Sequence, residues 1–173
     1  TCPVIVMDTA PAAILGAMLD PRVAAKSRLL VANIGNFHAL AFRLGPVGIE
    51  AVFEHHTGLL DLPQLESLLT GLAEGTLTNE TVFASQGHGA FVFGEEPLSL
   101  DDGDFGLAVT GPRRGLLHGS RLRPYFAAPY GDMMLAGCFG LLLATADLLP
   151  DLAPPIRLAL AGAGQDVAPW DTA

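Results

Sequence analysis

The feature that most constrains the fold is a pair of apolar segments joined by residues that favour a tight turn. Residues 28–34 (RLLVANI) and 37–44 (FHALAFRL) are rich in the branched and aromatic side chains typical of strands. Gly35-Asn36 between them is a two-residue hairpin signal. Gly45-Pro46 makes the next turn, and residues 47–55 make a third strand. The sequence therefore predicts an antiparallel meander.

The signals around this meander predict one α/β domain. Residues 10–19 are rich in alanine and suit a helix. Asp61 and Gln64 resemble a capping box ahead of leucines at helical spacing. Residues 105–110 indicate a short buried strand, and residues 132–148 indicate a helix. This order favours a mixed sheet with an antiparallel hairpin meander and flanking helices.

Composition narrows the classes of function. The 173 residues carry a formal net charge of −9 with only 9 Lys and Arg, which argues against nucleic acid as a partner. No apolar run reaches the roughly 18 uncharged residues of a membrane span, and the longest, residues 133–146, suits a buried helix. Cys2 and Cys138 are isolated, so neither a zinc site nor a disulfide framework is indicated. We therefore expect no membrane partner and a cytoplasmic location.

The histidines are the remaining candidates for metal chemistry. None has the HExxH or HxH spacing of metal sites, so the sequence predicts no metal. His88, in the segment GHG, is an alternative functional histidine, and His38 lies close enough to the hairpin turn to point at it. The five histidines are His38, His55, His56, His88 and His118.

Four segments in this order resemble the second lobe of the actin, Hsp70 and sugar-kinase superfamily of ATP-binding proteins. Residues 8–16 (DTAPAAILG) are similar to the first helix that connects the two lobes. Residues 33–36 (NIGN) are similar to the hairpin that binds the β- and γ-phosphates, and residues 109–112 (VTGP) to the turn under the adenosine. Residues 131–146 are similar to the second connecting helix, so the resemblance covers about residues 4–147.

The resemblance implies a ribonuclease H-like fold that binds ATP with Mg²⁺. A tight turn exposes backbone N–H groups to an anion, and glycine allows a close approach. The catalytic residues stay unknown, because catalysis in this superfamily needs both lobes. The residues that the resemblance assigns to the nucleotide are Asn33, Gly35, Asn36, His38, Gly111, Pro112, Arg113 and Arg114.

Two positions depart from the superfamily pattern. Asn33 stands where an acidic residue usually begins the phosphate hairpin, and an amide coordinates Mg²⁺ more weakly and cannot act as a base. Pro112 stands where a second glycine is usual. Arg113 and Arg114 could stack on a base, pair with a phosphate, or fill the adenine space. Two functions stay open: an ATP-binding lobe for phosphoryl transfer or hydrolysis, and a non-catalytic α/β interaction domain that has lost turnover. A small metal- or histidine-dependent enzyme is the third interpretation.

The chain resembles only one lobe of a two-lobed protein. It begins with Thr1, and the first-lobe phosphate loop is not recognisable, so residues 1–173 are expected to form a single domain, the C-terminal lobe of a longer protein. Its expected partners are the N-terminal lobe and a nucleotide, and an apolar face left by a missing lobe would favour a homodimer. Small residues at helical spacing, Ala12/Gly16 and Ala136/Gly140, would let the connecting helices cross closely.

Within the superfamily, the chain also resembles a narrower prokaryotic group labelled as pyruvate formate-lyase-activating enzymes. That label implies an iron–sulfur cluster held by a closely spaced cysteine triplet. Cys2 and Cys138 cannot supply one, so the activity is not carried over to this segment.

Overall fold

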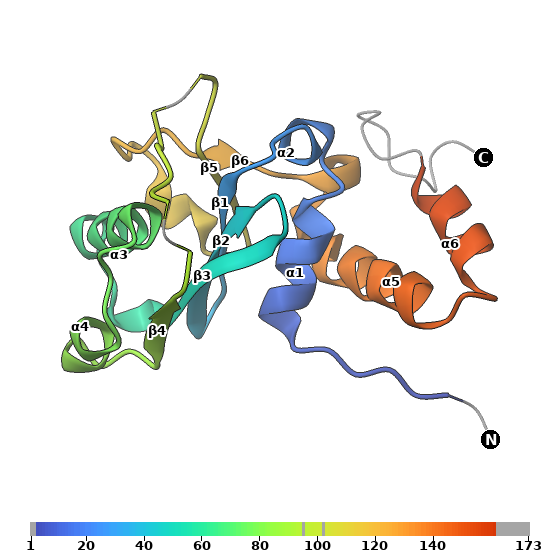
Figure 1. Cartoon of the computed structure of the whole chain (residues 1–173), viewed down its shortest axis with the longest axis horizontal. Helices are drawn as coiled ribbons and strands as arrows, with labels where there is room; N and C mark the ends of the chain where they lie inside the picture. The colour runs from blue at the N-terminus through green and yellow to red at the C-terminus, as the bar shows by residue number, and fades with distance from the viewer. Residues whose placement is uncertain (1–2, 95, 102, 162–173) are drawn as a thin grey trace. The chain divides into compact units, whose positions relative to one another are not determined.

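The computed structural model describes residues 3–94, 96–101 and 103–161. They separate into two compact units, shown in Figure 1. Unit 1 contains the described residues up to Ala25 and from Ala127 onward, and unit 2 runs from Lys26 to Phe126.

Unit 2 is built on a mixed sheet with the strand order β4-β3-β2-β1-β5-β6 (Figure 1). Strands β1 to β4 are antiparallel neighbours, whereas β5 is parallel to β1 and β6 is parallel to β5. The predicted antiparallel meander and mixed sheet are therefore confirmed. The strands are β1 (Leu29–Ile34), β2 (His38–Gly45), β3 (Gly48–His56), β4 (Gly89–Val92), β5 (Leu107–Thr110) and β6 (Tyr125–Phe126).

Alternate residues of the strands form the core of unit 2 with helix α3 (Leu62–Glu74). Ile34 and Phe53 lie in this core with Leu69 of the helix, and all three are almost completely buried. The predicted capping box begins the helix: Asp61 accepts from the Gln64 amide at 2.9 Å and donates its own amide to the Gln64 side chain at 3.0 Å. Unit 2 also contains α4 (Asn79–Ala84) and the 3₁₀ turns η1 (Thr57–Leu59) and η2 (Arg114–Leu117).

A buried arginine ties the sheet to the end of α3. Arg43 on β2 has no exposed surface, and it donates to the carbonyl oxygens of Leu72 and Ala73 and to that of Gly94. Its Nε lies 3.3 Å from the Glu50 carboxylate. The charge is thus paired within the core, as a buried charge must be.

Unit 1 is helical, and its main contact is a close crossing of two helices. A Cβ atom added to Gly16 of α1 would overlap the Ala136 carbonyl, and one added to Gly140 of α5 would overlap the Ala12 carbonyl. The predicted close approach of these helices is therefore confirmed. The elements are α1 (Thr9–Ala17), α2 (Pro21–Ala24), η3 (Pro129–Gly131), η4 (Met133–Leu135), α5 (Ala136–Leu148) and α6 (Ala153–Leu160).

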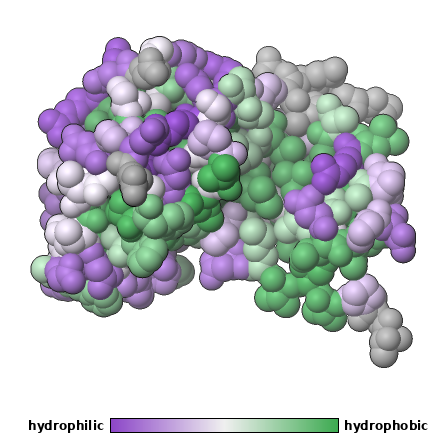
Figure 2. All heavy atoms as spheres, viewed as in Figure 1, coloured by the Kyte–Doolittle hydropathy of each residue, from purple (hydrophilic) through white to green (hydrophobic). Residues whose placement is uncertain are grey.

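The second predicted helix differs from the observed one in two respects. Helix α5 begins at Ala136 and not at residue 132, because Asp132 caps the short η4 turn by accepting from the Met134 amide at 2.8 Å. The helix is also less buried than its composition suggested, since Leu142 and Leu148 are 43% and 65% exposed. In Figure 2, apolar side chains cover much of the visible surface of unit 1. In the described ranges, every helix is too short or too polar to cross a bilayer.

Candidate functional site

The first half of the candidate site is the turn between β1 and β2. The strands pair as far as Ile34 opposite Ala39, and the Gly35 amide donates to the His38 carbonyl at 3.0 Å. The turn therefore spans residues 35–37, one residue more than the two predicted. A Cβ atom on Gly35 would lie 2.7 Å from the His38 carbonyl oxygen, so this position needs glycine.

The second half is the turn after β5, which lies against the end of β1. Because β5 is the parallel neighbour of β1, Thr110 pairs with Asn33 and both strands end at the same edge. Gly111 has a φ of +96°, and a Cβ atom there would lie 2.6 Å from the Ile34 carbonyl oxygen and 2.7 Å from Oδ1 of Asn33. The Arg113 amide donates to the same Ile34 carbonyl at 2.9 Å. The two turns, distant in sequence, are thus one place in the structure.

Two polar side chains lie where these strands end. Asn33 is 8% exposed and Thr110 is fully buried. Both occupy the face of the sheet opposite α3, since their neighbours Ile34 and Val109 lie in the core that α3 completes. Oγ1 of Thr110 has no hydrogen-bond partner among the described residues. A buried hydroxyl without a partner is costly, and a ligand or an ordered water at this edge would satisfy it.

The other residues assigned by resemblance lie around these turns with different exposure. Asn36 is exposed at the tip of the hairpin, and Pro112 and Arg113 are exposed in the second turn. Arg114 instead opens η2, with its guanidinium 5.8 Å from the centre of the Phe126 ring. Burial lowers the pKa of Arg114 from its ordinary value. The structure therefore brings Asn33, Gly35, Gly111 and Arg113 together at one sheet edge. It places the Arg114 guanidinium over Phe126 of β6 instead.

His38 belongs to a group of three imidazoles that sequence spacing did not reveal. It lies opposite His56 in the β2–β3 ladder, with ring centres 5.2 Å apart, and the ring of His88 is 4.8 Å from His38 and 4.4 Å from His56. The potential ligand atoms of these residues all lie within 4.8 Å of one another. We call His38, His56 and His88 the histidine cluster.

A register shift decides which histidines join the cluster. The ladder from β2 to β3 shifts by one residue beside Arg43, so that His38 faces His56 rather than His55. His55 points to the other face, where it is 1% exposed and its Nε2 lies 2.9 Å from the Ser85 carbonyl oxygen. Burial is the main cause that lowers the pKa of His56, and the neighbouring His88 and His38 lower it further. The positions of these three side chains could only be read from the sheet register.

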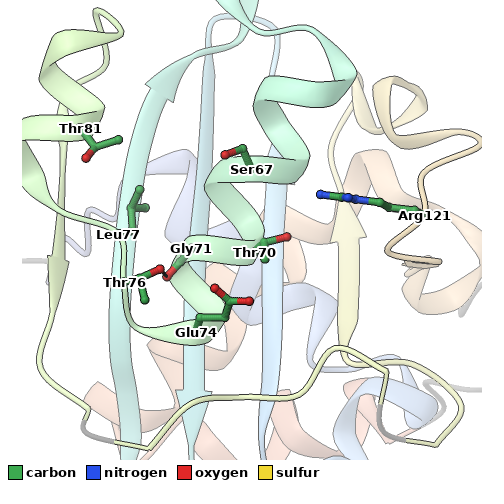
Figure 3. A pocket seen from close by; sticks show the side chains of 8 residues that line it. All are labelled: Ser67, Thr70, Gly71, Glu74, Thr76, Leu77, Thr81 and Arg121. Atoms are coloured by element: carbon green, nitrogen blue, oxygen red, sulfur yellow. Dashed lines mark hydrogen bonds between the residues drawn. The ribbon is translucent and has the colours of Figure 1, made fainter.

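A hollow with a volume of about 260 Å³ lies beside α3, and Figure 3 shows the side chains that line it. None of its lining residues belongs to the hairpin, the Gly111 turn or the histidine cluster. It therefore contributes nothing to the candidate site. Its lining residues are Ser67, Thr70, Gly71, Glu74, Thr76, Leu77, Thr81 and Arg121.

These elements define an α/β fold with a mixed sheet in unit 2. A family model described as "Putative pyruvate format-lyase activating enzyme (DUF1786)" matches residues 1–116. The chain belongs to this family, and the narrower resemblance seen in the sequence is confirmed. No curated protein and no solved structure shows significant similarity to the chain.

Proposed function

We propose that this chain is the ATP- and Mg²⁺-binding lobe of a two-lobed protein of the actin-like ATPase superfamily, with a ribonuclease H-like fold. The observation that carries the proposal is the pairing of β1 with β5, which places the hairpin turn and the Gly111 turn at one sheet edge. The element order supports it too: helix α1, the β1–β2 hairpin, β5 with its glycine turn, and helix α5 follow the order of that lobe.

The residues at this edge fit a phosphorylated nucleotide. The turn would offer the backbone N–H groups of Asn36 and Phe37 to phosphate oxygens, and the absence of a Cβ on Gly35 leaves the backbone approachable. The amide oxygen of Asn33 would be an oxygen ligand for Mg²⁺ or its water shell, and the buried Thr110 hydroxyl beside it has no partner among the described residues. Gly111 and Arg113 would lie under the nucleoside. ATP, when bound, supplies a transferable phosphoryl group, and the chain's own part is to position and neutralise it.

The alternative is a non-catalytic α/β interaction domain of the same fold. Asn33 favours it, because an amide can neither act as a base nor hold Mg²⁺ as strongly as a carboxylate. Pro112 favours it as well, since it replaces the flexible second glycine of the superfamily turn. If the chain is an enzyme, it is an ATPase or kinase-like phosphotransferase that also requires its N-terminal lobe. The exposed leucines of α5 and α6 support the docking of that lobe or of a second copy.

The chemistry suggested by the family's description does not fit the residues of this chain. An iron–sulfur cluster of the radical-activating type needs three closely spaced thiolates. The sequence has two cysteines far apart, of which Cys138 is exposed and free and Cys2 lies outside the described residues. We therefore assign no radical step to this chain.

Calorimetric titration of the native protein with Mg-ATP tests the proposal. Gly35→Ala should weaken binding at least tenfold, because the new Cβ would press on the His38 carbonyl. Gly58→Ala is the matched control: no atom lies within 4 Å of its Cβ position, and affinity should not change. Failure of the native protein to bind Mg-ATP, or equal affinity of Gly35→Ala, would refute the assignment.

Turnover of the Asn33→Asp variant separates the two functions. A carboxylate at this position restores the acidic residue of the superfamily hairpin, so hydrolysis should rise or stay unchanged in an ATPase. A clear loss of hydrolysis would indicate that the Asn33 amide itself contributes to turnover. Mg-ATP binding without turnover in either protein would favour the non-catalytic domain.

A further inference from the structure

We propose that His38, His56 and His88 bind one Zn²⁺ ion, or another transition dication that prefers imidazole ligands. The three side chains come from β2, the end of β3 and the residue before β4, and their potential ligand atoms already lie within 4.8 Å of one another. Neutral imidazole is a preferred ligand of zinc, and three histidines with an open fourth position are a known ligand set. The inference needs no nucleotide and does not depend on the proposed function.

The distances suit a site that closes around the ion. Zinc–nitrogen bonds of about 2.0–2.1 Å in a tetrahedral site place the nitrogens about 3.3 Å apart. No separation in the cluster exceeds this by more than about 1.5 Å, which small rotations of the rings can remove. These rotations are available because the His38 side chain is 44% exposed, His56 is half-buried and His88 is exposed.

The backbone under the cluster is held in place. His38 and His56 are directly opposite each other in the β2–β3 ladder. The His88 amide donates to the Glu54 carbonyl at 2.9 Å, which fixes the third residue to β3. Gly89 then takes a φ of +132°, a conformation that favours glycine, as the chain enters β4. The scaffold thus fixes the three Cα positions and leaves the rings free to turn.

The residues around the histidine cluster also favour a bound cation. Oε1 of Glu54 lies 3.5 Å from Nδ1 of His38, and a carboxylate in this position orients a ligating histidine and raises its basicity. His55 does not compete, because both of its ring nitrogens lie within 3.1 Å of backbone carbonyl oxygens. A bound metal would keep one position for water or a ligand oxygen.

Zinc binding by the metal-free native protein tests the proposal. Titration with Zn²⁺ alone should show one equivalent bound, and Co²⁺ should give the visible absorption of a tetrahedral site. His56→Gln should weaken zinc binding at least tenfold. His118→Gln is the control, because His118 is an exposed histidine outside the cluster and its loss should leave affinity unchanged.

Two further variants keep the test decisive. His88→Gln changes an exposed side chain, so this variant should fold even if His56→Gln does not. It should lose zinc binding as well. Cys138→Ser removes the free thiol and should retain binding. Absence of a stoichiometric site in the native protein, or unchanged affinity in folded His88→Gln, would overturn the proposal. Neither result would bear on Mg-ATP binding, so failure of the zinc proposal is distinguishable from failure of the proposed function.

Discussion

Replacing Gly111 with alanine tests whether the second turn really packs on the end of β1. The variant should lose stability for two separate reasons. A residue with a Cβ at this positive φ costs about 1–2 kcal/mol. The Cβ would also lie 2.6 Å from the Ile34 carbonyl oxygen, an atom held by the hydrogen bond from the Arg113 amide.

Relief of that contact must come from backbone movement, since the nearest atom is not the end of a flexible side chain. Overpacking of this kind costs about 1–3 kcal/mol, so Gly111→Ala should lose about 2–5 kcal/mol. Gly119→Ala is the matched control, because Gly119 has a φ of +76° with no atom within 4 Å of its Cβ position. It should lose about 1–2 kcal/mol.

Urea unfolding followed by circular dichroism measures both losses, and the difference between the variants isolates the contact. Gly111→Ala should also weaken Mg-ATP binding, whereas Gly119→Ala should not. If both variants are equally stable, the Gly111 turn does not pack on Ile34. The observation that carries the proposed nucleotide site would then be lost.

Three further changes test other contacts of the two units. Arg43→Met should cost about 3 kcal/mol in urea unfolding, because it removes the buried guanidinium that binds the carbonyl oxygens of Leu72 and Gly94 and pairs with Glu50; a loss below 1 kcal/mol would contradict this. The Ser120 hydroxyl, 2.7 Å from Glu66, is the main cause that lowers the pKa of that carboxyl. Ionised Glu66 therefore stabilises the fold above its unfolded pKa, and this contribution is lost as the pH falls through the lowered folded pKa. The melting temperatures of native protein and Ser120→Ala should converge on acidification, and a constant gap would contradict the assignment. Gly140→Ala should destabilise unit 1 by driving a Cβ into a carbonyl of α1. Gly137→Ala, on the same helix with 4.0 Å of clearance, should be neutral or stabilising by up to about 1 kcal/mol; equal effects would refute the close crossing.

Much of the fold could be predicted because its signals are local. The capping box of Asp61 and Gln64 involves residues three apart, and the helix it begins follows directly. The meander of β1, β2 and β3 needs only short turns between strands, so its order was readable too. The turn lengths were less certain: the hairpin at residues 35–37 has one residue more than its glycine–asparagine signal suggested.

The candidate site could be predicted only in pieces. Asn33, Gly35 and Gly111 were recognised as separate motifs, and the sequence alone could not place the second turn on the first. That placement depends on the parallel pairing of β1 with β5, which joins strands separated in sequence by β2, β3, α3, α4 and β4. The pairing buries both strands in the same core, a condition set by packing across the whole sheet.

The histidine cluster shows the same limit most clearly. The sequence determines where the five histidines lie and that none has a metal-ligand spacing. Tertiary structure selects three of them through the one-residue shift between β2 and β3, which brings His56 to His38 and sends His55 into the core. Side chains alternate between the two faces of a strand, so such a shift exchanges the residues on each face. Local sequence thus determined the strands, turns and caps, and long-range packing decided which of their side chains meet.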